Sequence, residues 1–172
     1  MARNLERWVD GIVIRTFSQK LLEEFAQAAP KLQVINALSD EQHPCQALAD
    51  VYTIREHVGD LRGAIVTFVG DGNNVARSLA KAAIKLGYPI TLVGPSNFQL
   101  EPMEGLTQTT DLAEGLAGAR MVYTDVWVSM GDEESADSRR LAAAGGFHQH
   151  GFGADHFWAS TDLRPTMAHI GQ

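Results

Sequence analysis

The stretch "AIVTFVGDGNNVARSLAKAAIKLGYPITLVG", residues 64–94, decides the fold of this chain. Its first seven residues are apolar and rich in β-branched side chains, which predicts a strand. The turn "DGNN" follows, and then Val75, Leu79 and Leu86 share one apolar stripe of a predicted helix. Pro89–Gly94 is the next predicted strand. This order indicates a right-handed βαβ unit with parallel strands.

The same alternation precedes this unit. Gly11–Phe17 is typical of a strand buried on both faces, and Leu32–Leu38 of a second buried strand. Ser18 is the expected cap of a helix between them, which stops near Pro30. Another helix is predicted over residues 44–58, with a proline at its first position.

After the central unit the pattern weakens. Pro95–Thr110 is interpreted as a polar loop, "DLAEGLAG" (111–118) as a short helix, and "RMVYTDVWVSMG" (120–131) as a strand that runs into a loop. The last thirty residues show no period, so no helix or strand is predicted there. Strands that alternate with helices predict an α/β fold with a parallel sheet.

Composition limits the possible functions. The 172 residues carry a net charge of −7 and no Lys/Arg cluster, so we expect no nucleic-acid partner. No apolar run is long enough for a membrane span, and the N-terminus lacks the apolar core of a signal peptide. A single cysteine fits a reducing compartment. These features favour a cytoplasmic protein that binds small molecules.

"HPCQALAD" (43–50) places His43 and Gln46 at the mouth of the predicted helix. Free N–H groups and the helix dipole favour an anion there. His43 can donate to an oxygen that bears negative charge, and Gln46 offers a donor and an acceptor. Spacing alone also allows a capped helix with two surface side chains, and on spacing alone we favour that alternative.

Arg15 lies in a predicted strand that is otherwise too apolar for a cation. An unpaired buried charge costs several kcal/mol. Either a carboxylate therefore pairs with Arg15, or Arg15 lies at the carboxyl end of its strand, where open α/β sheets bind ligands. The sequence leaves both alternatives open.

"GDGNN" (70–74) stands where Rossmann proteins place a phosphate-binding turn. Val75 replaces the third glycine, and Gly94 stands where a ribose-binding acid is expected, so a dinucleotide site is poorly supported. Two asparagines follow, Asn73 and Asn74. One is expected to cap the helix, and the other to keep a free amide for a ligand.

"TDVWVSMG" (124–131) carries Asp125 at the end of a strand, followed by Ser129 and Met130. An acid at this position can bind an amine, although for Asp125 taken alone we favour a loop-capping role. His148, His150 and His156 lack a carboxylate or cysteine framework, so no metal site is predicted, and we expect them to be exposed or disordered.

Together, "HPCQALAD", "GDGNNVARSL" and "TDVWVSMG" resemble the ornithine carbamoyltransferases, over about residues 3–141. The resemblance implies transfer of a carbamoyl group from carbamoyl phosphate to L-ornithine in arginine metabolism, giving L-citrulline and phosphate without a cofactor. It implies that Arg15, His43 and Gln46 contact carbamoyl phosphate, with Arg15 and His43 on the carbonyl oxygen. It also implies an ornithine site, formed by Asn74 or Asn73 with Asp125, Ser129 and Met130.

The resemblance further implies a division of the chain. Residues 1–58 would be part of a carbamoyl phosphate domain, 59–141 an incomplete Rossmann-like ornithine domain, and 142–172 an atypical tail. The resemblance also implies that intact relatives form trimers, an assembly that is doubtful for this chain. The family's Ser-x-Arg-Thr-Arg and His-Cys-Leu-Pro motifs do not occur, and we therefore expect a truncated chain with impaired turnover. The alternatives are a non-catalytic remnant and a small-molecule-binding Rossmann module.

Overall fold

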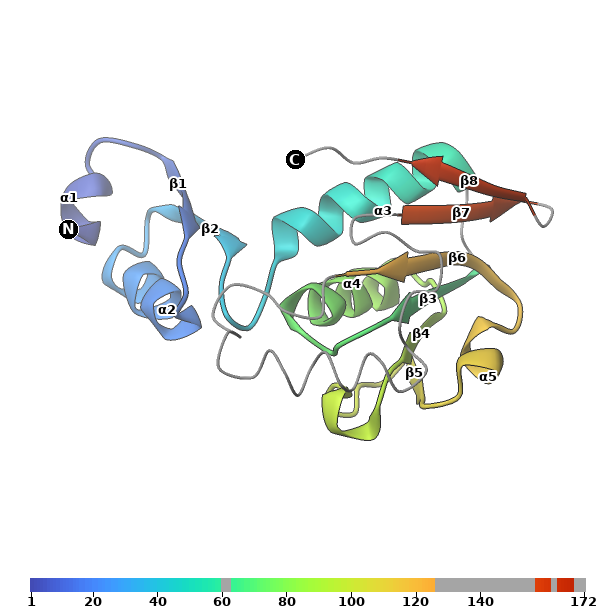
Figure 1. Ribbon diagram of the computed structural model, residues 1–172. Helices are drawn as coiled ribbons and strands as arrows, with labels where there is room; N and C mark the ends of the chain where they lie inside the picture. The colour runs from blue at the N-terminus through green and yellow to red at the C-terminus, as the bar shows by residue number, and fades with distance from the viewer. Residues whose placement is uncertain (60–62, 126–156, 162–163, 169–172) are drawn as a thin grey trace.

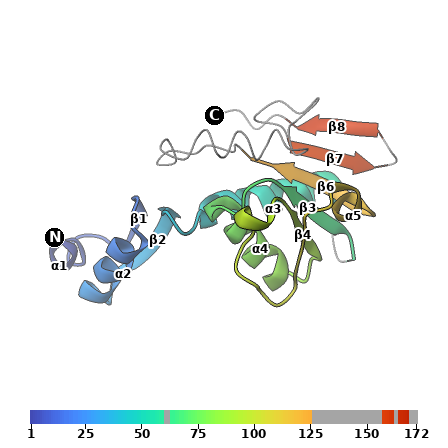
Figure 2. The ribbon, with the colours of Figure 1, turned by 60° about the horizontal axis from the view of Figure 1, so that its bottom comes forward.

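The computed structural model describes residues 1–59, 63–125, 157–161 and 164–168, and it divides into two lobes (Figure 1). The smaller lobe holds the N-terminus and a two-stranded sheet. The larger lobe holds a six-stranded sheet, and the turn that follows β2 leads into it (Figure 2). No helix in the described ranges is long and apolar enough to cross a membrane.

The smaller lobe is a βαβ unit. Its elements are α1 (Ala2–Leu5), β1 (Gly11–Arg15), α2 (Gln19–Ala28) and β2 (Gln33–Leu38). The two strands are parallel, and α2 crosses between them as predicted. A small core of Ala2, Ala29 and Leu32 lies under α2, with partly buried side chains from both strands packed against it.

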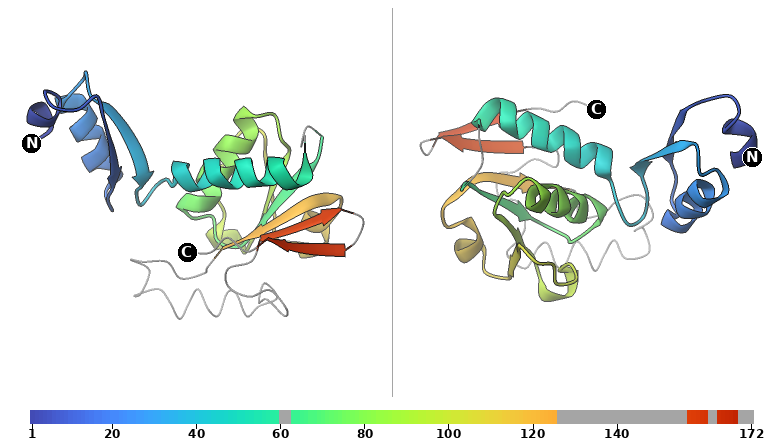
Figure 3. Two further views of the ribbon diagram at one scale, coloured as in Figure 1. Left: turned by 90° about the horizontal axis from the view of Figure 1, so that it is seen from above. Right: turned by 180° about the vertical axis from the view of Figure 1, so that it is seen from behind.

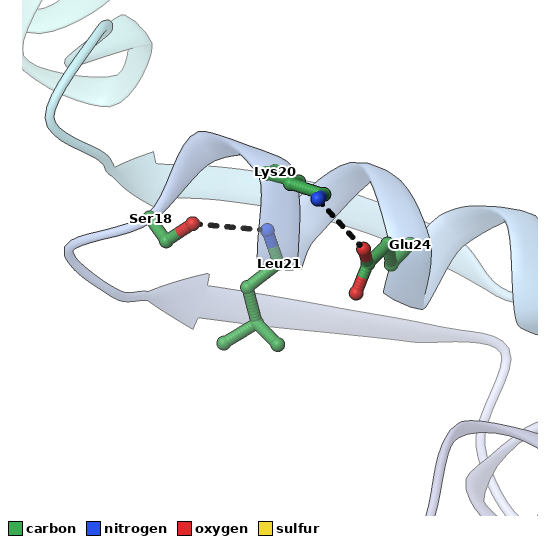
Figure 4. A network of polar contacts seen from close by, with 4 residues as sticks. All are labelled: Ser18, Lys20, Leu21 and Glu24. Atoms are coloured by element: carbon green, nitrogen blue, oxygen red, sulfur yellow. Dashed lines mark hydrogen bonds and ion pairs between the residues drawn. The ribbon is translucent and has the colours of Figure 1, made fainter.

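The first turn of α2 is capped as the sequence predicts. The hydroxyl of Ser18 accepts a hydrogen bond of 3.3 Å from the backbone N–H of Leu21 (Figure 4). Lys20 and Glu24 form an exposed ion pair of 3.8 Å one turn further along the helix. An exposed pair of this kind adds little stability, so the cap is the more useful of the two contacts.

The prediction that both strands of this lobe are buried on both faces is wrong. Val13 of β1 is 63% exposed, and Ile35 of β2, its partner in the register, is 49% exposed. Helix α2 covers one face of the two-stranded sheet, and no described element covers the other. The strands are apolar on both faces, but the described residues bury only the face that packs against α2.

The larger lobe is built on the predicted central unit. Its elements are α3 (Pro44–Val58), β3 (Ile65–Val69), α4 (Asn74–Lys85), β4 (Ile90–Val93), the 3₁₀ turn η1 (Ser96–Phe98), β5 (Leu106–Thr109), α5 (Leu112–Leu116), β6 (Ala119–Thr124), β7 (Phe157–Thr161) and β8 (Arg164–Ala168). The strand order is β5-β4-β3-β6-β7-β8, and the first four strands are parallel. The predicted α/β fold with a parallel sheet is confirmed.

Helices cover both faces of the parallel strands. Phe68 of β3 joins the main core with Leu79 of α4 and Val51 of α3, and these two helices lie side by side in both views of Figure 3. The neighbouring Thr67 points to the opposite face, where its hydroxyl donates a hydrogen bond of 2.8 Å to the carbonyl of Gly115 in α5. Thus α5 lies across the sheet from α4.

Three strands were not predicted. Residues 106–109, within the expected polar loop, form β5, because four residues at the edge of the sheet need no long apolar run. Strands β7 and β8 lie in the tail, where the sequence shows no period, and they extend the sheet antiparallel from β6. The remaining tail residues, including His148, His150 and His156, lie outside the described ranges.

Gly72 owes its place in the "GDGNN" turn to packing. A Cβ there would lie 2.7 Å from the carbonyl oxygen of Phe98 and 2.9 Å from the backbone nitrogen of Leu100. The backbone N–H of Gly72 also donates a hydrogen bond of 2.7 Å to that same Phe98 carbonyl. The glycine therefore lets the segment after η1 cross the turn closely.

We expect Gly72→Ala to destabilise the fold by about 1–3 kcal/mol, because backbone atoms must move to admit the methyl group. Urea unfolding followed by circular dichroism measures the change. Gly11→Ala is the matched control, since a Cβ there meets its nearest atom at an ordinary 3.4 Å. Equal midpoints for the two variants would contradict this account.

We expect the chain to self-associate through the uncovered face of β1 and β2, because Val13 and Ile35 leave apolar surface in water. Light scattering after size exclusion, over a range of concentrations, measures the mass. Val13→Lys with Ile35→Lys should shift the chain toward the monomer. Leu86→Lys, at an exposed leucine on the other lobe, is the control. A monodisperse wild-type monomer would show that this face needs no cover.

Candidate active site

His43 lies immediately before α3, as its N-cap residue. Its backbone N–H donates a hydrogen bond of 2.8 Å to the hydroxyl of Ser78, which in turn donates to the carbonyl of Asn74. Helix α4 therefore holds the start of α3 in place. The ring Nδ1 of His43 is buried and has no hydrogen-bond partner among the described residues.

The ring of His43 is held in its neutral form. Burial lowers its pKa from 6.5, and the nearby positive charge of Arg15 lowers it further, while Asp125 acts in the opposite direction. A neutral imidazole carries one N–H donor and one acceptor. His43 can thus offer a hydrogen bond near neutral pH without bringing a full charge into the site.

Arg15 is the last residue of β1, and its side chain is exposed. It makes no ion pair with a described residue. The prediction that Arg15 is buried in its strand is therefore wrong, and no partner is needed to offset a buried charge, although Arg15 does lie at the carboxyl end of β1. The effect of Arg15 on the pKa of His43 places its charge near the ring.

Asn73 and Asp125 join the ends of two neighbouring strands. Asn73 caps α4, where its side-chain oxygen accepts hydrogen bonds of 3.0 Å from the backbone N–H groups of Val75 and Ala76. Its amide nitrogen donates to Asp125 Oδ2 at 3.2 Å. One asparagine thus serves both as the helix cap and as a partner of the acid after β6.

The expectation of a free amide on the second asparagine is wrong. The amide nitrogen of Asn74 donates a hydrogen bond of 2.7 Å to the carbonyl of Ser39, in the loop before α3. That loop lies beside the start of α4. Its carbonyl accepts the hydrogen bond that the Asn74 amide was expected to offer to a ligand. Ser129 and Met130 lie outside the described residues.

Asp50 is a part of this region that the sequence analysis missed. It is fully buried in α3, and Gln46 Nε2 donates a hydrogen bond of 2.9 Å to its Oδ1. Burial raises the pKa of Asp50 from 3.8 to about 6, against hydrogen bonds from Gln46 and Tyr123 that lower it. The spacing of four residues on a helix was the available signal, because Gln and Asp at i and i+4 meet.

Tyr123 connects this carboxyl group to β6. Its ring stacks on Phe68, with centroids 5.4 Å apart, and its hydroxyl bonds to Asp50. Burial, and then the charge of Asp50, raises the pKa of the Tyr123 hydroxyl, which therefore stays protonated and acts as the donor. Asp125 follows two residues later, so Asp50 and Asp125 belong to one connected region.

The structure thus brings together most of the predicted site residues. Arg15 and Asp125 both influence His43, and Asp125 also influences Asp50. Cys45, the chain's only cysteine, is exposed on the first turn of α3, and its thiol lies 3.4 Å from the carbonyl of Asn36. Within the described ranges, no group of three or more metal-ligating side chains is placed to hold an ion.

Two family models match the chain in sequence. The carbamoyl-P binding domain of aspartate/ornithine carbamoyltransferases matches residues 1–56, and the Asp/Orn binding domain matches residues 62–149. Ornithine carbamoyltransferase of Symbiobacterium thermophilum is 43% identical in an alignment of 157 positions that covers 84% of this chain and 50% of that protein. The enzyme of Deinococcus radiodurans is 46% identical, with the same two shares.

Solved structures agree with these matches. Ornithine carbamoyltransferase from Thermus thermophilus aligns with a TM-score of 0.73 and 39% identity, over 84% of this chain and 48% of that one. The enzyme from Pyrococcus furiosus gives 0.73 and 40%, over 82% and 49%. The chain spans about half the length of the curated relatives it matches.

The raised pKa of Asp50 predicts a pH-dependent effect of Asp50→Asn on stability. A folded pKa above the unfolded one means that the contribution of Asp50 is fully present below pH 3.8 and is lost as the pH rises through about 6. The variant should therefore gain about 2 kcal/mol relative to wild type between pH 4.5 and 7.5, at roughly 1.4 kcal/mol per unit of pKa shift, because part of the shift is already lost at pH 4.5.

Urea unfolding of both proteins at the two pH values measures this gain. Glu101→Gln, at an exposed glutamate, is the control for removal of one negative charge. If the difference between Asp50→Asn and wild type is the same at both pH values, the buried carboxyl does not titrate as described.

Proposed function

The chain belongs to the aspartate/ornithine carbamoyltransferase family, and from this premise we propose that its site serves carbamoyl transfer from carbamoyl phosphate to L-ornithine. The observation that carries the proposal is the placement of a neutral, half-buried His43 at the mouth of α3, within the electrostatic influence of both Arg15 and Asp125. A donor for an oxygen and an acid for an amine thus lie in one region.

In the proposed reaction the neutral side-chain amine of ornithine attacks the carbamoyl carbon. The carbonyl electron pair moves to the oxygen, and a tetrahedral oxyanion forms. Its collapse breaks the bond between carbon and the bridging oxygen, so that phosphate leaves, and the amine nitrogen loses a proton. Catalysis of this kind depends on positioning and on donors aimed at the developing charge.

We assign His43 and Arg15 to the carbonyl oxygen. The neutral ring of His43 supplies an N–H, and Arg15 supplies positive charge that strengthens the interaction as the oxyanion develops. Removal of one such donor typically lowers the rate by about 10²–10³. Gln46, half-buried one turn into α3, is assigned to the amide of the carbamoyl group.

We assign Asp125 to the α-ammonium group of ornithine. Its carboxylate already accepts a hydrogen bond from Asn73, which fixes its direction. In this proposal Asn73 and Asn74 position the acid and the neighbouring loop, and Ser129 and Met130 complete the ornithine site. The chain division at residues 58 and 141 is part of the same proposal.

The uncovered face of β1 and β2 favours a second candidate, a non-catalytic remnant that depends on a partner.

A citrulline assay on the purified chain tests the proposal. We expect formation of citrulline from carbamoyl phosphate and ornithine, and none with aspartate or putrescine as acceptor. Asp125→Asn should raise the KM for ornithine, while His43→Asn should lower kcat by about 10²–10³. Glu101→Gln is the matched surface control. Absence of citrulline at every concentration would favour the non-catalytic remnant.

A further inference from the structure

The buried Asp50 lies behind Gln46, on the same side of α3. Gln46 Nε2 donates to Asp50 Oδ1 at 2.9 Å, and the carboxyl group has no exposure to solvent. An ionised carboxylate only accepts hydrogen bonds. It therefore binds the NH₂ end of the Gln46 amide and turns the oxygen end away from itself.

The oxygen end of Gln46 is unused. Gln46 Oε1 accepts no hydrogen bond from a described residue, whereas its amide nitrogen is occupied by Asp50. The side chain is half-buried one turn behind His43, on the first turn of the helix. Gln46 can therefore offer a ligand only its amide oxygen, which accepts hydrogen bonds, because its amide nitrogen already donates to Asp50.

Asp50 is itself held in place from the sheet. The hydroxyl of Tyr123 bonds to its carboxyl group, and the ring of Tyr123 is stacked on Phe68. Gln46 of α3 and Tyr123 of β6 thus both bear on this carboxyl group, whose Oδ2 is buried without a hydrogen-bond partner among the described residues. If the Gln46 amide rotated, its oxygen end would face the carboxylate, and two acceptors would meet without a donor between them.

We propose that Asp50 is a positioning residue that fixes the amide orientation of Gln46, so that the site accepts a hydrogen bond from the NH₂ group of a carbamoyl ligand and disfavours an acyl ligand that carries a methyl group instead. This inference rests on the proposed function, because it assigns Gln46 to the carbamoyl group. It concerns ligand selectivity, which a merely structural role of Asp50 does not predict.

Two phosphonates test the selectivity. In both, a methylene group replaces the labile bridging oxygen; one is phosphonoacetamide, with a terminal NH₂, and the other is 2-oxopropylphosphonate, with a terminal methyl group. Calorimetric titration gives the ratio of their Kd values. We expect wild type to prefer the amide by about tenfold, the equivalent of one hydrogen bond, and Asp50→Asn to lose most of this preference, since asparagine bonds to either end of the Gln46 amide.

A double-mutant cycle separates positioning from general damage. Gln46→Leu alone should remove the preference, and Asp50→Asn in that background should change it no further, because Asp50 acts through Gln46. Additive losses of selectivity would overturn the proposal. Circular dichroism confirms that each variant is folded, and Glu101→Gln should keep the wild-type ratio.

A second measurement needs no ligand. In wild type the side-chain amide protons of Gln46 should exchange slowly with solvent in nitrogen-15 NMR spectra, and in Asp50→Asn their exchange and chemical shifts should change. If wild type binds neither phosphonate, the proposed function fails and the selectivity claim fails with it. If both bind and Asp50→Asn keeps the wild-type ratio, the selectivity claim fails alone and the proposed function stands.

Discussion

The packing of α3 against α4 is the constraint on which the rest of this structure depends. Helix α3 follows directly from the smaller lobe, yet its buried face, which includes Ala47, Asp50 and Ile54, belongs to the core of the larger one. A polar contact also links the two helices, because the Ser78 hydroxyl of α4 accepts a hydrogen bond from the backbone N–H of His43. The position of the site relative to the sheet therefore follows from how these two helices lie together.

Most of the larger lobe could be predicted from the sequence, because each of its central elements is locally consistent. Asn73 is a strong helix cap, and the apolar periods change from strand to helix on either side of it. The rest depended on distant contacts. Strand β5 has only four residues and forms because β4 offers an edge, and the exposure of Val13 and Ile35 reflects missing cover that no local pattern reveals.

The candidate site divides in the same way. His43, Gln46 and Asp125 could be named as candidates because each stands near the end of a helix or strand, where α/β folds gather ligand-binding groups, but only the family resemblance gave them roles. Asp50 could not, since an acid inside a helix is usually solvated, and its partner Tyr123 lies more than seventy residues away in the sequence. The hydrogen bond from the Asn74 amide could not be predicted either, because its acceptor, the Ser39 carbonyl, lies in a loop 35 residues earlier in the sequence.

The single thiol of the chain has a practical consequence. Cys45 is exposed, lies on the first turn of α3 between His43 and Gln46, and has no competing cysteine anywhere in the 172 residues. A maleimide-linked fluorophore would therefore attach at one known point without any engineering of the chain. Its emission would report, in real time, on the solvation of the helix terminus that carries His43 and Gln46.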